Sequence, residues 1–445
     1  MAIDELSRQW AGTLLERWDL PVRLASATEP GDAVRDWAES GALTVTGRRD
    51  GPAMLPPGAA ATAARGAELA FDALCGQILD RDLASRDWRG LLGERVPLLG
   101  LHRNGPWSAG GTCRAVATAD AWVAMSLARP DDVVAVAALT ESAEIPADAH
   151  SAWKLLDEWA ARTSTDDVVE RAALLGMPCG GVPEAGTWSA RAECGGYPAV
   201  VHETSTSYAS DGTAKQPLVV DLSALWAGPL AARLLGFAGA RVVKVELAGR
   251  LDGARRGSAR FYELLHGGHD SVLLDPRAPE EVNLLRALLD RADIVIESSR
   301  PRALAALGID AATRCVNSPV TWVSITAYGR DAGHRVGFGD DVAMSAGLTV
   351  RDADNTPLPV GDAIADPLTG LHAAVLALAA HCAGGSRLID IAMRDVVATA
   401  SSWHEPEHAR RFVVNTATHE EKPTGPAADP GRDTERWREI VLGGT

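Results

Sequence analysis

The sequence lacks the features that mark secreted, membrane-spanning and disulfide-stabilised proteins. Its six cysteines are scattered without a C-x-x-C pair, which indicates neither a disulfide framework nor a zinc site. No apolar run approaches the roughly 20 residues of a membrane helix. The first twenty residues contain Asp4 and Glu5 and no apolar core of the kind found in secretory signals. We therefore expect a cytoplasmic protein with reduced thiols, no metal and no membrane partner.

Basic residues are also in deficit, with 43 Lys and Arg against 59 Asp and Glu and a formal net charge of −16. Phosphate backbones are bound by clustered Lys and Arg, so we expect no nucleic-acid partner. A local basic pocket for a small anion stays compatible with this balance. The length of 445 residues predicts two or three domains at roughly 150 residues each.

Short Val, Ile and Leu runs alternate with helical spacing between about 217 and 400. The runs cover 218–222, 241–246, 271–275, 293–297 and 320–326. This alternation predicts a parallel sheet with helices on both faces, hence an α/β fold with a Rossmann-like large domain. Glu246 ends the second run, as the acidic ribose ligand of dinucleotide folds does. The G-x-G-x-x-G turn is missing, however, so NAD or FAD is not expected.

An internal repeat relates two distant parts of the chain. DWAESGALTVTGRRDGP (36–52) aligns without a gap with DVAMSAGLTVRDADNTP (341–357), and seven of seventeen positions are identical. Each segment leads into an Ala- and Leu-rich helix, at 62–76 and 366–381. The second helix opens with Asp366, where the first has Ala61 or Thr62. We expect residues 36–80 to fold like 341–385 and to have a packing role only. They should lie in the large domain near the Asp366 helix, or replace a partner element that would otherwise come from later in the chain.

The dipeptide Asp366–Pro367 predicts a helix start, with Asp366 as N-cap and Pro367 at the first helical position. One interpretation is an ordinary cap. The other is catalytic, because free backbone N–H groups and the helix dipole keep such a carboxylate ionised. It could then attack a carbonyl carbon, while the same N–H groups stabilise the resulting oxyanion.

Five motifs in this region resemble, in order, those of the class III coenzyme A transferases, which include formyl-CoA transferase, carnitine-type CoA transferases and α-methylacyl-CoA racemases. The similar segments are VVDLSALWAGPLAARLLGFAGARVVKVE (219–246), ADIVIESSRPRALAALGI (292–309), WVSITAYGRDAG (322–333), GDAIADPLTGLHAAVLALAAH (361–381) and GGSRLIDIAMRDVV (384–397). Segments 111–132 and 155–182 resemble the family's small domain, but here they precede the Asp366 half.

The resemblance therefore implies a permuted order, with a smaller α+β domain ahead of the large one. We expect the following division: 1–100, a degenerate copy of the Asp-segment half that packs with the large domain; 101–185, the small domain; 186–216, a linker; 217–403, the Rossmann-like CoA-binding and catalytic half; 404–445, an extended C-terminal tail.

The resemblance also implies the activity, a transfer of CoA from an acyl-CoA to a carboxylic acid. Asp366 would form a mixed anhydride and then an aspartyl-CoA thioester, in a homodimer with no permanent cofactor and with the CoA thioester as substrate. The implied CoA-binding positions are Trp226, Ala227, Glu246, Arg300, Arg302, Gly339 and Asp340. Trp226 stands where transferases often have Gln, and is either core packing or a surface under the adenine or pantetheine.

Two alternatives stay open. Racemase members use a His–Asp pair, but Gly339 occupies the His place here, and two-base proton transfer needs both an acid and a base. An acyl-CoA isomerase or racemase would be favoured if the nearby His334 pointed at Asp366. A non-catalytic CoA-binding subunit is the other alternative, suggested by the degenerate repeat and the altered CoA positions.

Overall fold

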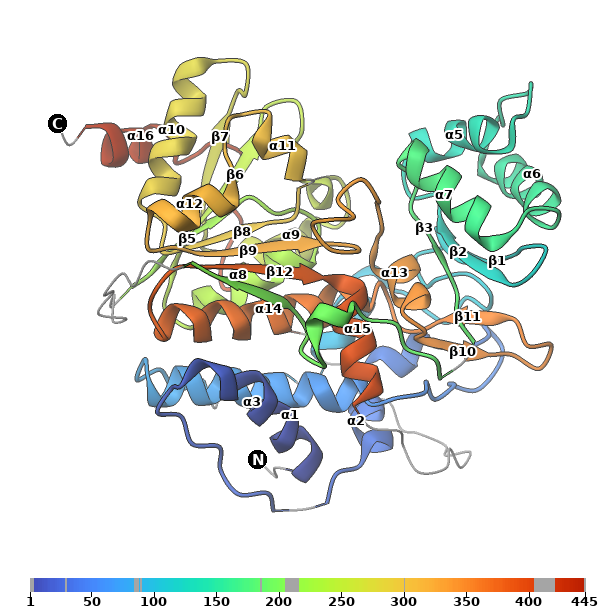
Figure 1. Ribbon diagram of the computed structural model, residues 1–445, viewed down its shortest axis with the longest axis horizontal. Helices are drawn as coiled ribbons and strands as arrows, with labels where there is room; N and C mark the ends of the chain where they lie inside the picture. Colours follow the sequence, from blue (N-terminus) through green and yellow to red (C-terminus); the bar gives the residue numbers. More distant parts are fainter. Residues whose placement is uncertain are drawn as a thin grey trace.

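The computed structural model places a sheet domain, a helical layer beneath it and a small domain to one side (Figure 1). The described residues are 4–28, 30–83, 88, 90–184, 186–204, 216–299, 301–403 and 421–443. Within them, no helix is both long enough and apolar enough to cross a bilayer.

The large sheet has seven strands in the order β4-β12-β9-β8-β5-β6-β7. The strands are β4 (Val200–Glu203), β5 (Leu218–Asp221), β6 (Arg241–Leu247), β7 (Asp270–Leu274), β8 (Ile294–Glu297), β9 (Thr321–Thr326) and β12 (Arg387–Ala392). All pair in parallel except β4, which is antiparallel to β12. If the six parallel strands are numbered 1 to 6 along the chain, their order in the sheet is 3-2-1-4-5-6, as in Rossmann folds. Ligands of such sheets bind where the strand order reverses, which is here between β5 and β8. The predicted α/β class with a parallel sheet is confirmed.

Both faces of the sheet are covered by helices, because the strands carry apolar residues on both sides. Helices α8 (Ala227–Phe237) and α14 (Ala365–Cys382) lie under one face and α10 (Pro279–Asp290) lies on the other (Figure 1). The remaining helices of this half are α9 (Ala259–His266), α11 (Pro301–Ala305), α12 (Ala311–Asn317), α13 (Gly339–Ser345) and α15 (Met393–Ser402).

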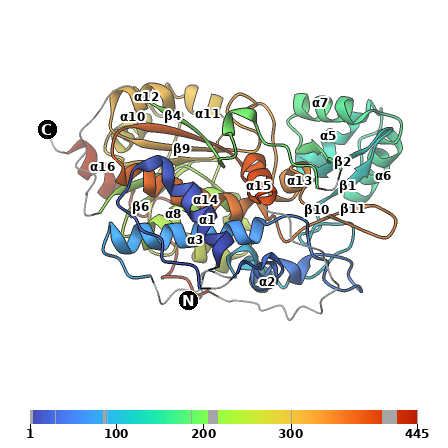
Figure 2. The same ribbon diagram turned by 60° about the horizontal axis from the view of Figure 1, so that its bottom comes forward.

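A second helical layer, built from the first hundred residues, covers α14. It contains α1 (Glu5–Leu15), α2 (Ala33–Glu39), α3 (Ala60–Gln77) and α4 (Arg95–Leu99). Both α1 and α3 contact α14, and Figure 2 shows them crossing below it. The buried Trp10 donates from Nε1 to His372 Nε2 at 3.0 Å, while His372 Nδ1 lies 2.8 Å from the Leu368 carbonyl oxygen. Because Nε2 of His372 accepts the bond from Trp10, the proton of the neutral ring is on Nδ1. The same bond fixes the position of α1 along α14.

The two copies of the repeat form corresponding helices. The gapless offset that aligns Asp36 with Asp341 also aligns both ends of α3 with both ends of α14, and it overlaps α2 with α13. Between the helices the copies differ, because the first forms a 3₁₀ turn at Ala42–Val45 and the second a hairpin of β10 (Thr349–Arg351) and β11 (Pro357–Pro359). The same offset sets Ala61 opposite Asp366. Common ancestry of the copies, and the permuted segment order, stay predictions.

The small domain pairs three antiparallel strands with three helices and has a core of its own. It contains β1 (Cys113–Ala117), β2 (Trp122–Ser126), α5 (Pro130–Thr140), α6 (Ala149–Ala160), α7 (Thr165–Leu175) and β3 (Cys179–Gly181). Strands β2 and β3 contact α13, which joins this domain to the half that holds Asp366.

Two segments differ from the expected division. Residues 200–203 of the expected linker form β4, which extends the sheet by pairing with β12. The expected extended tail contains α16 (Thr434–Leu442), which docks beside β7 and α10 through the buried Trp437. The Trp437 indole also donates to Asp270 Oδ2 at 3.1 Å. One buried aromatic side chain thus supplies the packing that a polar, Pro- and Gly-rich tail did not indicate. The predicted stretch 404–420 lies outside the described residues.

Candidate active site

Asp366 lies in the first turn of α14 and is partly buried. The helix begins at Ala365, so Asp366 is its second residue, and the prediction that Asp366 is the N-cap is wrong. Pro367 is tolerated at the third position because the first four N–H groups of a helix have no intrahelical partner. The carboxylate is therefore free of a capping role within its own helix.

A strained turn brings the chain into α14. Ala363 has φ +44, in the left-handed region that a residue with a side chain seldom adopts. Its N–H donates to Asp340 Oδ1 at 2.8 Å, and its carbonyl accepts from the Asp366 N–H at 2.8 Å. Asp340 thus holds the turn that orients Asp366. The first copy has Gly58 at the corresponding place, with φ +75, where the conformation is without strain.

Gly339 leaves the space that the Asp366 side chain occupies. A Cβ built at Gly339 would lie 2.3 Å from Asp366 Oδ2 and 2.3 Å from the Ala363 carbonyl oxygen. Even a methyl group at this position would displace either the carboxylate or the backbone of the strained turn. Gly339 therefore supports the geometry of Asp366 through close packing.

The N-terminus of α8 approaches Asp366 from the sheet side. The Ala227 N–H, the first of that helix, lowers the pKa of the Asp366 carboxyl. The approach depends on Gly370 in α14, because a Cβ there would lie 2.5 Å from the Ala227 carbonyl oxygen. A helix N-terminus with an unpaired N–H favours negative charge, both on the ionised carboxylate and on an oxyanion formed beside it.

Arg95 brings a cation to this site from the N-terminal layer. Its Nε and Nη2 donate to Asp362 Oδ2 and Oδ1 at 2.7 and 2.6 Å, in a bidentate pair. The guanidinium lies 4.7 Å from the ring centre of Trp226 and 5.6 Å from that of Phe261. Arg95 was not predicted from the sequence, because a single Arg in GERVPLLG has no motif and its partner is 267 residues away.

Trp226 is only 1 % exposed, so of its two interpretations the structure shows core packing. It lies beneath Arg95 and packs edge-on against Phe261, with ring centres 5.3 Å apart. An adenine ring could not stack on Trp226 in this arrangement.

The electrostatic environment raises the pKa values of two acids toward neutral pH. Burial raises the pKa of Asp366 to about 7; Arg95 and the Ala227 N–H lower it, while the charges of Asp340 and Asp362 raise it. Burial also raises the pKa of Asp340 to about 6, and the neighbouring Asp362 adds to the effect. Asp366 is consequently poised between its protonated and ionised forms near neutral pH.

The other predicted binding residues lie apart from this group. Glu246 is buried, accepts two hydrogen bonds from Arg255 Nε and one from Arg255 Nη2, and also accepts from the Asp252 N–H at 2.9 Å. Its carboxylate is therefore fully used inside the chain. Arg302 is exposed on α11, and Arg300 lies outside the described residues. The structure thus brings together Asp366, Gly339, Asp340, Ala227 and Trp226.

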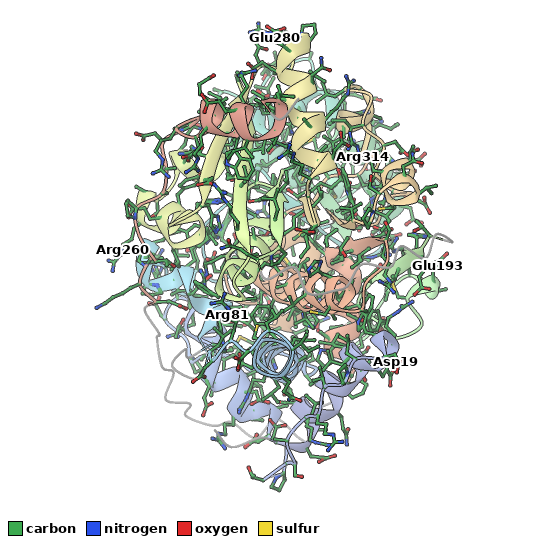
Figure 3. All side chains as sticks on the ribbon, turned by 90° about the vertical axis from the view of Figure 1, so that its left-hand side faces the viewer. Asp19, Arg81, Glu193, Arg260, Glu280 and Arg314 are labelled. Carbon is green, nitrogen blue, oxygen red and sulfur yellow. The ribbon has the colours of Figure 1, made fainter. Side chains whose placement is uncertain are left out.

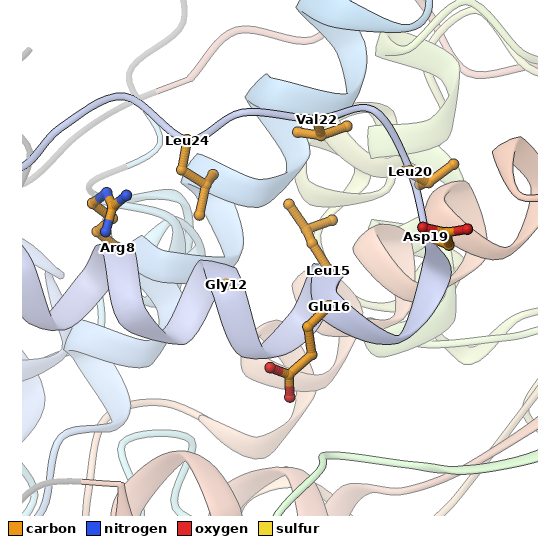
Figure 4. A pocket seen from close by; sticks show the side chains of 8 residues that line it. All are labelled: Arg8, Gly12, Leu15, Glu16, Asp19, Leu20, Val22 and Leu24. Atoms are coloured by element: carbon orange, nitrogen blue, oxygen red, sulfur yellow. The ribbon is translucent and has the colours of Figure 1, made fainter.

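Two cavities lie elsewhere in the described part of the molecule. One of about 320 Å³ opens between α1 and the segment after it and is lined by Arg8, Gly12, Leu15, Glu16, Asp19, Leu20, Val22 and Leu24 (Figure 4). Another of about 360 Å³ lies near Asp72 and Arg81 at the end of α3. Neither includes Asp366. Among the described residues, no group of three or more His, Cys, Asp and Glu side chains is arranged to hold a metal ion.

Asp341, next to Asp340, is turned toward the small domain. Its Oδ1 accepts from Ser126 Oγ at 2.7 Å and from the Phe338 N–H at 3.0 Å, and its side chain is fully buried. Burial raises the pKa of Asp341 to about 7, against the effect of the hydrogen bonds from Ser126 and Phe338. Below neutral pH the Asp341 carboxyl is therefore mainly protonated, and in this form it joins α13 to β2 through Ser126.

We expect Asp341 to make the protein less stable as pH rises. An acid whose folded pKa lies above its unfolded value binds more protons when folded, so the free energy of unfolding falls between the ordinary Asp value and about pH 7. In urea titrations between pH 5 and pH 8, Asp341→Asn should remove up to about 1.4 kcal/mol of that fall per pH unit. Ser126→Ala removes a hydrogen bond that lowers the pKa of Asp341, so in this variant the free energy of unfolding should go on falling to higher pH. Equal slopes in all three proteins would exclude this role.

Residues 215–432 match the model of CoA-transferase family III. This part of the chain, just under half of it, is similar to CoA-transferase family III. The match covers the parallel sheet, α8, α13 and α14, and hence Asp366, Gly339 and Ala227, but it does not reach Arg95.

Curated proteins that are similar to this chain carry transferase names. The chain is 31% identical to a succinate–glutarate CoA-transferase of Agrobacterium fabrum, over 40% of this chain and 50% of the relative. It is 28% identical to a succinyl-CoA–D-citramalate CoA-transferase of Chloroflexus aurantiacus, over 43% and 51%. The chain thus spans about half the length of the relatives it matches. A CAIB/BAIF family protein from Brucella suis matches 41% of this chain and 53% of its own, with 29% identity and a TM-score of 0.37.

Proposed function

We propose that the protein transfers CoA from an acyl-CoA to a free carboxylic acid through covalent intermediates on Asp366. The Asp366 carboxylate attacks the thioester carbonyl, and the C–S bond breaks. The CoA thiolate departs, and the acyl group stays on Asp366 as a mixed anhydride. The thiolate then attacks the Asp366 acyl carbon, which releases the donor as a carboxylate and forms an aspartyl-CoA thioester. An acceptor carboxylate reverses both steps. The thioester energy is stored on the enzyme throughout.

The observation that carries this proposal is the environment of the Asp366 carboxylate. The side chain is partly exposed, Gly339 leaves room for it, and the Ala227 N–H at the start of α8 favours its ionised form. An oxyanion formed at the attacked carbonyl would find the same helix N-terminus and the charge of Arg95. A structural acid would instead be enclosed and fully bonded, as Glu246 is.

Trapping of the enzyme-bound intermediate tests the proposal. The protein is incubated with a panel of acyl-CoAs and examined by intact mass spectrometry, before and after hydroxylamine. We expect an added CoA or acyl group that hydroxylamine converts to a hydroxamate, located at Asp366 by peptide mapping. A protein that binds acyl-CoA but gains no covalent group with any member of the panel would support the non-catalytic CoA-binding subunit.

The rate of acylation should rise with pH through about 7. Only the ionised form of Asp366 is a nucleophile, and its pKa is raised to about 7, so each unit below that value should lower the rate roughly tenfold. Release of CoA thiol in a single turnover, followed between pH 5 and pH 8.5, measures this dependence. A rate that levels off already at pH 5 would show that Asp366 is not the group that titrates.

The isomerase alternative needs a second acid–base group beside Asp366. His334, the candidate named above, is exposed in the segment after β9, and in the described residues it is not among the groups that act on Asp366. The proposal is therefore transfer rather than two-base proton exchange. The homodimer implied by the family resemblance stays part of the proposal.

A further inference from the structure

Arg95 reaches the Asp366 site from a part of the chain that the family match does not include. It opens α4, directly after the 3₁₀ turn Leu91–Gly93, and its head lies between Asp362 and Trp226. Asp362 is completely buried, whereas the Arg95 side chain keeps 23 % of its exposure. A guanidinium bound through two parallel hydrogen bonds and stacked on a ring has few other positions available.

The neighbouring residues fix this segment to the large domain. Glu94 and Arg233 of α8 form a buried ion pair with Nη2–Oε2 and Nη1–Oε1 distances of 2.8 and 3.2 Å. Gly93 packs directly on Gly41, since a Cβ at Gly93 would lie 2.7 Å from the Gly41 carbonyl carbon. Glu94 and Arg95 thus bind α8 and the turn before α14, which are the two elements that frame Asp366, while Gly93 packs within the N-terminal layer.

The charged groups around Arg95 come from three places in the fold. Asp340 comes from α13, Asp362 from the strained turn and Asp366 from α14, and all three act on the Arg95 charge. Burial lowers the pKa of Arg95, but its hydrogen bonds and ion pair with Asp362 outweigh this, so the group stays a cation. On Asp366 the effects oppose each other, because the charge of Arg95 lowers the pKa and that of Asp362 raises it.

We propose that Arg95 is a positioning residue for Asp366, which makes the Leu91–Leu99 segment of the N-terminal layer part of the active site. By binding Asp362 and covering Trp226, the guanidinium holds the turn that precedes α14 and sets the charge beside the nucleophile. The proposal rests on the proposed function of Asp366. It also goes beyond the expectation that residues 1–100 pack with the large domain.

The test removes the charge of Arg95 and that of Asp362 in two separate variants. Arg95→Gln removes the cation and should move the pH dependence of acylation to higher pH, so that the rate at pH 6.5 falls about tenfold, as loss of a nearby opposite charge implies. Asp362→Asn removes the anion and should move the dependence to lower pH. A merely structural pair would give two variants that lose stability and activity together, with pH profiles shifted in the same direction or not at all.

Further variants keep the test decisive. Arg95→Lys keeps the charge and should restore the wild-type pH profile in part, while Arg260→Gln, on the exposed surface of α9 (Figure 3), should leave it unchanged. If Arg95→Gln does not fold, the direction of the Asp362→Asn shift decides. Wild-type protein that forms no covalent intermediate would overturn the proposed function itself. Wild-type and Arg95→Gln proteins that form the intermediate with the same pH profile would overturn only the role of Arg95.

Discussion

Replacing Asp366 by asparagine should abolish CoA transfer and leave the protein folded. The amide has the shape of the carboxylate but is no nucleophile, so we expect the transfer rate to fall by about four orders of magnitude, as when a covalent catalyst loses its reacting group. Asp366 is not the N-cap of α14, so no capping interaction is lost. Removing a charge that burial and two neighbouring acids disfavour should keep or raise stability at pH 8.

The controls distinguish the loss of the nucleophile from the loss of one negative charge in this part of the protein. Asp354→Asn, in the exposed turn between β10 and β11, should keep the wild-type rate. Asp366→Ala excludes slow deamidation as a source of residual activity. Transfer is followed by chromatography of the acyl-CoA products, and the covalent intermediate by intact mass. Turnover of either Asp366 variant within tenfold of wild type would remove Asp366 from the mechanism.

Replacing Gly339 by alanine should damage both the site and the fold. Gly339 has an ordinary helical setting at the start of α13, where alanine would normally add up to about 1 kcal/mol of stability. Here the new Cβ would lie 2.3 Å from the Ala363 carbonyl oxygen and from Asp366 Oδ2. We expect the free energy of unfolding to fall by about 1–3 kcal/mol. Displacement of the nucleophile by about 1 Å should slow acylation roughly 100-fold.

The matched control is the same substitution in open space. Gly12→Ala, within α1, meets no atom within 4 Å and should stabilise the protein slightly without changing the acylation rate. Denaturant unfolding and single-turnover thiol release measure the two effects. If Gly339→Ala behaves like Gly12→Ala, the contact between Gly339 and Asp366 does not constrain the site.

The sheet could be predicted from the sequence because its strands are local signals. Five apolar runs of five to seven residues, separated by helical spacing, are sufficient to indicate parallel strands, and each run forms one. Asp366 was found by its motif and by its place in the repeat. The N-cap prediction failed because Asp–Pro is typical of a cap, whereas the left-handed turn at Ala363 starts the helix one residue before Asp366.

The remaining parts of the site depend on contacts between distant segments. Trp226 is buried because Arg95 and Phe261 cover it, and nothing near Trp226 in the sequence indicates either partner. Glu246 matched a ribose-binding pattern, but Arg255 occupies its carboxylate. The partnership of Arg95 with Asp362 arises only when the N-terminal layer docks on α14.

The bond between Trp10 and His372 has a consequence for how the protein is made. The two residues are separated by 362 positions, so at roughly 5–20 residues per second the ribosome adds the second about 20–70 s after the first. During that time the apolar surfaces of α1 and α3 lack the helix that covers them. The N-terminal helices of the nascent chain are therefore exposed to aggregation until α14 has been synthesised. Expression at low temperature, or together with a chaperone that binds unfolded chains, should increase the yield of native protein.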